Sequence, residues 1–284
     1  MAVTAPLPLD ERAYAEIVAR ALQEDVGSGD LTTDAIVPEG QVATATLLLQ
    51  QPGVVSGIPV VEAVLRALDA DVQVRALVPE GAWVDDVPAR VAELEGSARA
   101  LLTGERVALN LFARLCGIAT LTRRYVDLVA GTGATILDTR KTTPGLRALE
   151  KYAVRCGGGT NHRMGLDDAI LIKDNHVRIA GGIEPALAAV RAAGSGLPVE
   201  IEADTLDQVE QALAAGAARI LLDNMSPAEV ARAVELVQGR ALLEASGGID
   251  EDTVRTYAET GVDFISIGAL THGARSLHVS LEVT

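Results

Sequence analysis

The chain has 284 residues, 49% of them apolar and 22% charged, so it can form two domains or one large one and is neither disordered nor collagen-like. Its formal charge of −15, from 24 Lys and Arg against 39 Asp and Glu, argues against a protein that coats nucleic acid or an anionic membrane. Aromatic residues make up only 2%, too few for a base-stacking surface, so we expect a core of Ala, Val, Leu and Ile.

The N-terminal part of the chain predicts an α+β domain. A helix capped at Asp10 is expected to run to Glu24. Three alternating runs then predict strands: VATATLLL (42–49), VQVRALV (72–78) and ARVAELE (89–95). Pro-Gly and Glu-Gly turns lie between them, so we expect a small sheet.

The boundary of this first domain is predicted near residue 112. Ser97–Ala130 has the pattern of one long helix that joins the two halves of the chain. We expect a sandwich-like N-terminal α+β domain over residues 1–112 and a second domain over residues 113–272. The C-terminal tail, 273–284, is expected to pack back on the first domain.

From Thr135 onward, apolar runs alternate with Ala-rich amphipathic stretches. Six runs predict strands: TILDT (135–139), DAILI (168–172), VEIEA (199–203), RILLDN (219–224), ALLEAS (241–246) and FISIG (264–268). The last four runs end near Glu202, Asp223, Ser246 and Gly268, which are 21, 23 and 22 residues apart, and each interval fits one strand plus one helix. A capping box at Ser226 to Glu229 begins a helix, and glycines stand where helices should stop. This regular α/β series favours a closed or nearly closed barrel of parallel strands.

The two cysteines, Cys116 and Cys156, are forty residues apart, which offers neither a disulfide framework nor metal-thiolate spacing. We interpret them as reduced thiols. The sequence shows neither a signal-peptide pattern nor a run of roughly 18 apolar residues, so we expect a soluble cytoplasmic protein.

Charged and glycine residues follow the predicted strands, where the loops of a parallel barrel converge on its active site. A single charge after a strand is usually a solvated loop residue, but a succession of six such ends predicts a site. These ends carry Arg140, Lys141, Lys173, Glu202, Asp223, Ser246-Gly247-Gly248 and Gly268.

Positive charge is concentrated in residues 140–178, which hold eight Lys or Arg against four Asp or Glu. The flanking segments, 1–139 and 179–284, carry net charges of −9 and −10. The natural ligand is therefore expected to be small and to carry several negative charges. Within this cationic segment we assign Lys151 and Arg155, four residues apart on a predicted helix, mainly to solvent.

Glu202 and Asp223 end neighbouring strands, so their carboxylates can converge on Mg²⁺ or form ion pairs with the cations, and the spacing leaves both open. Ser246-Gly247-Gly248 and Ser266-Ile267-Gly268 suit a phosphate, although glycine turns are common. Gly157-Gly158-Gly159 gives conformational freedom to the loop that carries His162, whose role as a catalytic, ligand-orienting or structural residue stays open.

Ten segments across nearly the whole chain closely resemble the nicotinate-nucleotide pyrophosphorylase family, the carboxylating enzymes also called quinolinate phosphoribosyltransferases. They are EDVGSGDLTT (24–33), GERVALNLF (104–112), GIATLT (117–122), DTRKTTPGLR (138–147), AVRCGGGTNHRMGL (153–166), LIKDNH (171–176), EIEAD (200–204), LLDN (221–224), ASGGI (245–249) and SIGALTH (266–272).

The resemblance implies a transferase that makes nicotinate mononucleotide, pyrophosphate and CO₂ from quinolinate and phosphoribosyl pyrophosphate, with Mg²⁺, in NAD biosynthesis. It implies an incomplete, seven-stranded β/α barrel beside the α+β domain, although our pattern finds six strands. It also implies a homodimer with shared active sites, with assembly to a hexamer left open, and no nucleic-acid or membrane partner.

Site residues carry over from the resemblance only where the segments match. The implied quinolinate pocket contains Arg140, Lys141, His162, Arg163 and Lys173, with Arg106 supplied by the partner subunit. Lys141, Lys173 and His162 also reach the ribosyl donor. The metal and ribose side contains Glu202 and Asp223, which with Lys141 and Lys173 form the expected catalytic set. The phosphate side contains Ser246, Gly247, Gly268 and His272.

Two other classes of function remain compatible with the pattern. Lys173 at a strand end could be the nucleophile of a Schiff-base aldolase, although so many neighbouring cations argue against it. A non-catalytic anion-binding barrel is the other, and it would need no acidic pair beside the cations. Within the transferases, a relative that uses another pyridine or heterocyclic acid also remains open.

Overall fold

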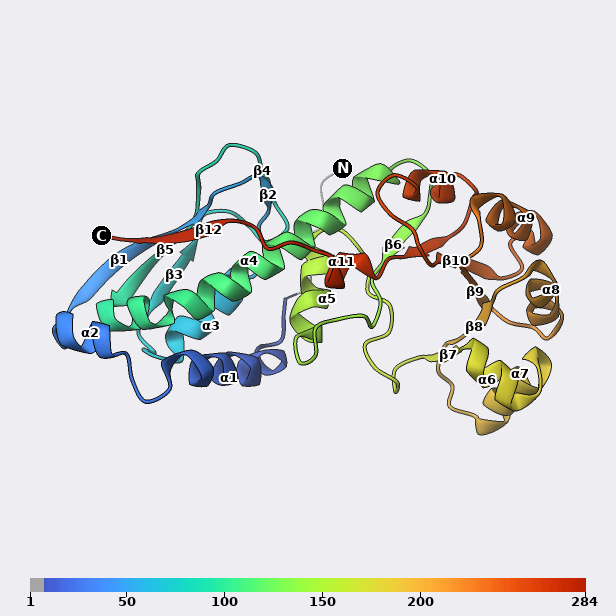
Figure 1. Ribbon diagram of the computed structural model, residues 1–284, viewed down its shortest axis with the longest axis horizontal. Helices are drawn as coiled ribbons and strands as arrows, with labels where there is room; N and C mark the ends of the chain where they lie inside the picture. The colour runs from blue at the N-terminus through green and yellow to red at the C-terminus, as the bar shows by residue number, and fades with distance from the viewer. Residues whose placement is uncertain (1–7) are drawn as a thin grey trace. The chain divides into compact units, whose positions relative to one another are not determined.

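The computed structural model describes residues 8–284, and the chain divides into two compact units (Figure 1). The first unit contains the N-terminal part up to Arg123, the segment Thr142–Gly158 and the C-terminal segment Leu270–Thr284. The second contains Arg124–Lys141 and Gly159–Ala269. The first unit thus extends beyond the predicted boundary near residue 112, and the chain returns to it twice.

A small antiparallel sheet forms the framework of the first unit, in the order β12-β1-β5-β3, beside a separate β2-β4 pair. The strands are β1 (Val42–Leu49), β2 (Gly53–Val54), β3 (Gln73–Ala76), β4 (Trp83–Val84), β5 (Ala89–Ser97) and β12 (Val279–Val283). The helices are η1 (Glu11–Ala13), α1 (Ala15–Val26), α2 (Leu31–Ile36), α3 (Ile58–Arg66), α4 (Ala98–Leu128), α5 (Arg147–Cys156) and α11 (Ala269–His272).

All three strands predicted in the N-terminal part are present, and α4 confirms the long helix predicted over Ser97–Ala130. The C-terminal strand β12 adds to the sheet by antiparallel pairing with β1, from Ala45 opposite Val283 to Leu49 opposite Val279. The sheet of the first unit therefore pairs the first strand of the described residues with the last one.

The core of the first unit is aliphatic, as the composition predicts. Leu47 and Leu49 of β1 and Leu101 of α4 are fully buried. Helices α3 and α4 pack so closely at Gly104 that an added Cβ would lie 2.8 Å from Leu65 Cδ2. Among residues 8–284, no helix is long and apolar enough to cross a membrane.

The assignment of Lys151 and Arg155 to solvent is wrong. Lys151 is fully buried and Arg155 is half-buried. Spacing alone misled here because α5 is buried on nearly every side: its Tyr152 hydroxyl donates to Glu80 Oε2 at 2.8 Å, and its fully buried Glu150 pairs with Arg114 at 2.8 Å.

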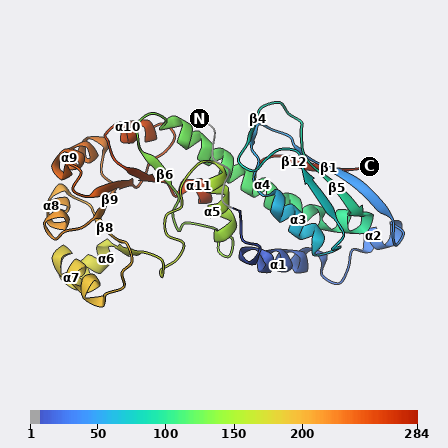
Figure 2. The ribbon, with the colours of Figure 1, turned by 180° about the vertical axis from the view of Figure 1, so that it is seen from behind.

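The second unit is a parallel sheet with helices along its outer side, which Figures 1 and 2 show from opposite directions. Its strand order is β6-β11-β10-β9-β8-β7. The strands are β6 (Thr135–Leu137), β7 (Ile170–Ile172), β8 (Val199–Ala203), β9 (Arg219–Asp223), β10 (Leu242–Ser246) and β11 (Phe264–Ser266). The helices are α6 (Asp174–Ala180), α7 (Ile183–Ala193), α8 (Leu206–Ala214), α9 (Pro227–Val237) and α10 (Val254–Ala258).

All six predicted runs are strands, and the α/β class is confirmed. The predicted capping box at the start of α9 is also present: Ser226 Oγ accepts from the Glu229 N–H, and Glu229 Oε2 accepts from the Ser226 N–H at 2.9 Å. A helix therefore follows β9 at the position that the sequence indicates.

The sheet has six strands where the family resemblance implies seven. Next to β6, within residues 8–284, the structure has one parallel bridge, between Leu137 and Thr160, in place of a further strand. Thr160 follows three glycines, which favour neither strand nor helix. The barrel is therefore incomplete, and the segment beside β6 is a loop that carries His162.

Candidate active site

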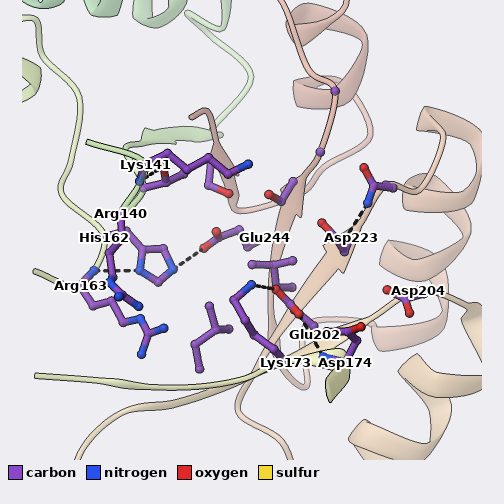
Figure 3. A pocket seen from close by; sticks show the side chains of 18 residues that line it. Arg140, Lys141, His162, Arg163, Lys173, Asp174, Glu202, Asp204, Asp223 and Glu244 are labelled. Carbon is purple, nitrogen blue, oxygen red and sulfur yellow. Dashed lines mark hydrogen bonds and ion pairs between the residues drawn. The ribbon is translucent and has the colours of Figure 1, made fainter. Parts of the chain in front are cut away.

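A cavity of about 950 Å³ lies at the carboxyl ends of the strands of the second unit, and all of its lining residues belong to that unit (Figure 3). Nine of the twelve predicted site residues line it: Arg140, Lys141, His162, Arg163, Lys173, Glu202, Asp223, Ser246 and Gly247. The sequence prediction therefore located the pocket.

Three predicted site residues do not line this cavity. Gly268 lies two residues after the end of β11 in the second unit. Arg106 on α4 and His272 on α11 are exposed residues of the first unit. Their assignments remain predictions.

Strand alternation explains how the acidic side of the pocket forms. Side chains two residues apart on a strand share a face, so Glu202, Leu221 and Glu244 project from the same side of the sheet. Leu221 is paired in register with both glutamates, on β8 and on β10. Asp223, two residues after Leu221, continues this inward-facing set.

Glu202 forms an ion pair with the Lys173 ammonium, and its other oxygen accepts from the Asp174 N–H at 3.2 Å (Figure 3). The sequence left two roles open for Glu202, Mg²⁺ binding and ion pairing, and the structure shows the ion pair. Burial, followed by the charges of Glu202 and Asp204, raises the pKa of Asp223. A cation near these carboxylates would relieve that repulsion.

The opposite side of the pocket carries positive charge. Arg140 Nε is buried and has no hydrogen-bond partner among residues 8–284. Burial, followed by the charge of Arg140, lowers the pKa of Arg163, and Arg163 Nη1 donates to the Ala169 carbonyl at 3.1 Å. Within residues 8–284 these two guanidinium groups repel one another and form no ion pair with a carboxylate, so they suit an anion with more than one negative charge.

Asp138 fixes the loop that carries His162, and the sequence prediction missed it. This fully buried carboxylate accepts from the Asn161 side chain at 2.6 Å and from the His162 N–H at 2.8 Å. Its position at the end of β6, two residues before Arg140, was the available signal. It holds the loop against the strand end that bears Arg140.

A second missed group lies beneath the pocket. His162 Nε2 is 3.0 Å from Glu200 Oε2 and 3.5 Å from Glu244 Oε2. Arg219 pairs with both carboxylates, at 2.8 Å to Glu200, and its guanidinium carbon lies 4.3 Å from the centre of the Phe264 ring. The available signal in the sequence was a glutamate inside each of the apolar runs VEIEA and ALLEAS. Such a glutamate places a charge on a buried strand face, where it needs a partner.

One imidazole and two carboxylates could also ligate a metal, since their ligand atoms lie within 4.8 Å of one another. Arg219 already supplies the cation for Glu200 and Glu244, however. We therefore assign no metal to this group, and Mg²⁺ beside Glu202 and Asp223 stays a prediction.

The glycine turn after β10 brings the backbone close to the acidic side. Gly247 has a φ of +98°, and an added Cβ would lie 2.2 Å from Asn224 Oδ1. Asn224 in turn donates from Nδ2 to Asp223 Oδ2 at 2.8 Å. Gly247 is therefore needed both for its backbone angle and for space beside the residue that orients Asp223.

A parallel β/α sheet whose carboxyl edge gathers several cations and a pair of carboxylates defines an enzyme that acts on small, multiply charged anions. Residues 30–116 match the family model for the quinolinate phosphoribosyl transferase N-terminal domain, and residues 118–282 match the one for the C-terminal domain. The chain belongs to the quinolinate phosphoribosyl transferase family.

Relatives that match over nearly their full length agree with this assignment. The nicotinate-nucleotide pyrophosphorylase [carboxylating] of Mycobacterium leprae is 46% identical, covering 95% of this chain and 97% of the relative. The probable enzyme of the same name from Bacillus subtilis is 45% identical over 92% and 90%. The crystal structure of NadC from Streptococcus pyogenes superposes with a TM-score of 0.94 at 40% identity, covering 98% and 99% of the two chains.

We predict that Glu202→Gln lowers the pKa of Asp223, because the change removes a neighbouring negative charge that raises it. The measurement is a ¹³C NMR titration of the Asp carboxyl carbons without metal, with Asp223→Asn to assign the signal. Asp207→Asn, at an exposed position on α8, is the matched control and should leave the pKa of Asp223 unchanged. An unchanged or higher pKa in Glu202→Gln would show that the two carboxylates are not coupled.

Proposed function

We propose that this protein transfers the phosphoribosyl group of phosphoribosyl pyrophosphate to quinolinate with loss of CO₂. The products are nicotinate mononucleotide, pyrophosphate and CO₂, and the reaction belongs to NAD biosynthesis. The family match and the names of the relatives support this activity. In this proposal the protein works in the cytoplasm and binds neither nucleic acid nor membrane.

The observation that carries the proposal is the charge separation within one cavity. Arg140 and Arg163 lie on the cationic side, where neither forms an ion pair with a carboxylate of residues 8–284, and Glu202 and Asp223 lie on the acidic side. Quinolinate is a dicarboxylate and its co-substrate is rich in phosphate, so both need the cations. The acidic pair is needed because the ribose becomes positively charged as pyrophosphate departs.

In this mechanism Arg140, Arg163 and Lys141 bind the two carboxylates of quinolinate and orient its ring nitrogen toward the ribose. Lys173, held by Glu202, lies between the two substrates and binds oxygens of either. Binding both anions in one cavity accounts for part of the rate by positioning alone. After the ring nitrogen has gained the ribosyl group, its positive charge accepts the electrons released as CO₂ leaves.

Glu202 and Asp223 stabilise the positive charge that develops on the ribose. The same pair fits Mg²⁺, a hard cation that prefers carboxylate oxygens, because the pKa of Asp223 is raised by burial and by the neighbouring carboxylates. When bound, Mg²⁺ would neutralise the pyrophosphate leaving group. Ser246 and Gly247 present hydroxyl and backbone groups to phosphate, and we assign Gly268 and His272 to the same side.

The aldolase alternative fits the geometry less well. A Schiff-base lysine must present an uncharged amine to a carbonyl carbon. Lys173 instead forms an ion pair with Glu202, which stabilises the charged ammonium. A non-catalytic anion-binding barrel would need no acidic pair such as Glu202 and Asp223 beside its cations.

Product analysis tests the proposed reaction. With Mg²⁺, quinolinate and phosphoribosyl pyrophosphate should yield equal amounts of nicotinate mononucleotide, pyrophosphate and CO₂. Nicotinate lacks the 2-carboxylate and would leave buried guanidinium donors unpaired, so its kcat/KM should be lower by about 10⁴-fold. Comparable turnover of nicotinate would refute the dicarboxylate assignment.

We further propose a homodimer in which Arg106 of each subunit completes the partner's site. Arg106→Ala and Lys141→Ala should each be nearly inactive, because each removes a cation that binds the dicarboxylate. Subunit exchange between them would produce heterodimers with one intact site, so about a quarter of wild-type activity should return. As the control, a mixture of Lys141→Ala with Arg140→Ala, whose defects lie in one chain's own site, should stay inactive.

The heterodimers can be detected by native mass spectrometry of differently tagged subunits. If they form and the Arg106→Ala and Lys141→Ala mixture remains at the activity of its parents, Arg106 acts within its own subunit or only in folding.

A further inference from the structure

The two ring nitrogens of His162 have different and defined partners. Nδ1 lies 2.8 Å from the backbone N–H of Arg163, which donates to it (Figure 3). Nε2 lies 3.0 Å from Glu200 Oε2 and 3.5 Å from Glu244 Oε2. A nitrogen that accepts a hydrogen bond carries no proton, and a nitrogen that faces carboxylate oxygens must donate one. The arrangement is therefore that of a neutral imidazole with its proton on Nε2.

A charged imidazolium does not fit this geometry. Protonated Nδ1 would direct its N–H at the N–H of Arg163, and both donors would then lose their partner. The His162 side chain is only 13% exposed, so water replaces such a bond poorly. Asp138 also holds the His162 N–H at 2.8 Å, which limits how far the residue can move to escape.

The charges that face the ring balance without a positive His162. Arg219 pairs with both Glu200, at 2.8 Å, and Glu244, so its single positive charge offsets one of the two carboxylates. Glu244 is fully buried, and its Oε1 has no hydrogen-bond partner in the part of the chain that the structure describes. An unpartnered buried oxygen is least costly when its carboxyl is neutral. In agreement, burial, followed by the charge of Glu200, raises the pKa of Glu244.

On the other side of the loop, Arg163 and Arg140 already repel one another, and Asp168 lies close enough to Arg163 to offset part of that charge. A third cation at His162 would add to the repulsion. A neutral ring adds none and ties the Arg163 backbone to the buried strands β8 and β10 through Glu200 and Glu244.

We propose that His162 is a positioning residue, held as the neutral Nε2–H imidazole, and is not one of the positive charges that bind the substrate. It fixes the backbone of Arg163 relative to Glu200, and so sets where the Arg163 guanidinium meets an anion. The link to quinolinate binding rests on the proposed function, whereas the protonation state of the ring does not.

¹⁵N NMR of histidine-labelled protein tests the ring directly, with His162→Gln to assign its signals. At neutral pH, His162 should show one unprotonated nitrogen and one protonated nitrogen, and the protonated one should be Nε2. Glu244→Gln, a neutral group of the same shape, should leave the pattern unchanged. Two protonated nitrogens at neutral pH, or a proton on Nδ1, would overturn the assignment even if the protein lacked the proposed activity.

Kinetics test the positioning role. Gln can still donate toward Glu200, so His162→Gln should lose less than about 10-fold in kcat/KM for quinolinate, and His162→Ala about 100-fold, mostly through KM. The acidic limb of the pH profile of kcat/KM should be the same in wild type and His162→Gln. If Gln fails to rescue, or if that limb disappears with the imidazole, His162 acts through its charge or its proton and the proposal is wrong. Should His162→Ala not fold, the ¹⁵N NMR spectra and the Gln pH profile still decide.

Discussion

The structure depends on holding several positive charges together at one edge of a parallel sheet in a protein whose net charge is −15. Arg140 and Arg163 are close enough to disturb one another, and the repulsion must be offset within the fold before any ligand arrives. The charges of Asp168, Glu200 and Glu202 offset part of it at Arg163. Asp138 fixes the loop between the two arginines, and Glu202 holds Lys173.

The sheet makes this arrangement possible because its strands deliver acids at fixed spacing. Glu202 on β8 and Glu244 on β10 both pair in register with Leu221, so carboxylates alternate with an aliphatic side chain across the pocket floor. Glu202 forms an ion pair with Lys173, and Glu244 lies against His162 and Arg219. The carboxylates thus take their positions from strand register, whereas His162 and Arg163 lie on the loop that Asp138 holds.

Much of this could be predicted from sequence. The six apolar runs have a regular spacing, and charged residues at their ends identified most of the pocket, because β/α repeats place such ends together. The capping box at Ser226 was also reliable, since it depends on four consecutive residues.

The failures share one physical cause, which is that a local pattern does not show what packs against it. Lys151 has the spacing of a surface residue, yet α5 is enclosed by the first unit. Glu200 and Glu244 lie inside apolar runs and were overlooked, because a buried charge is tolerated only when distant partners such as Arg219 are present. The expected seventh strand is a single bridge at Thr160, where a glycine run disfavours extended pairing.

The central claim is that the guanidinium groups of Arg140 and Arg163 bind a dicarboxylate, and calorimetry of quinolinate binding to Arg140→Met tests it most directly. Met keeps much of the side chain's apolar length and removes the charge. The account predicts that quinolinate affinity falls by at least about 10-fold, while the much weaker affinity for nicotinate changes less, since a buried charge-assisted bond to one carboxylate is lost. Equal quinolinate affinity in wild type and Arg140→Met would contradict it.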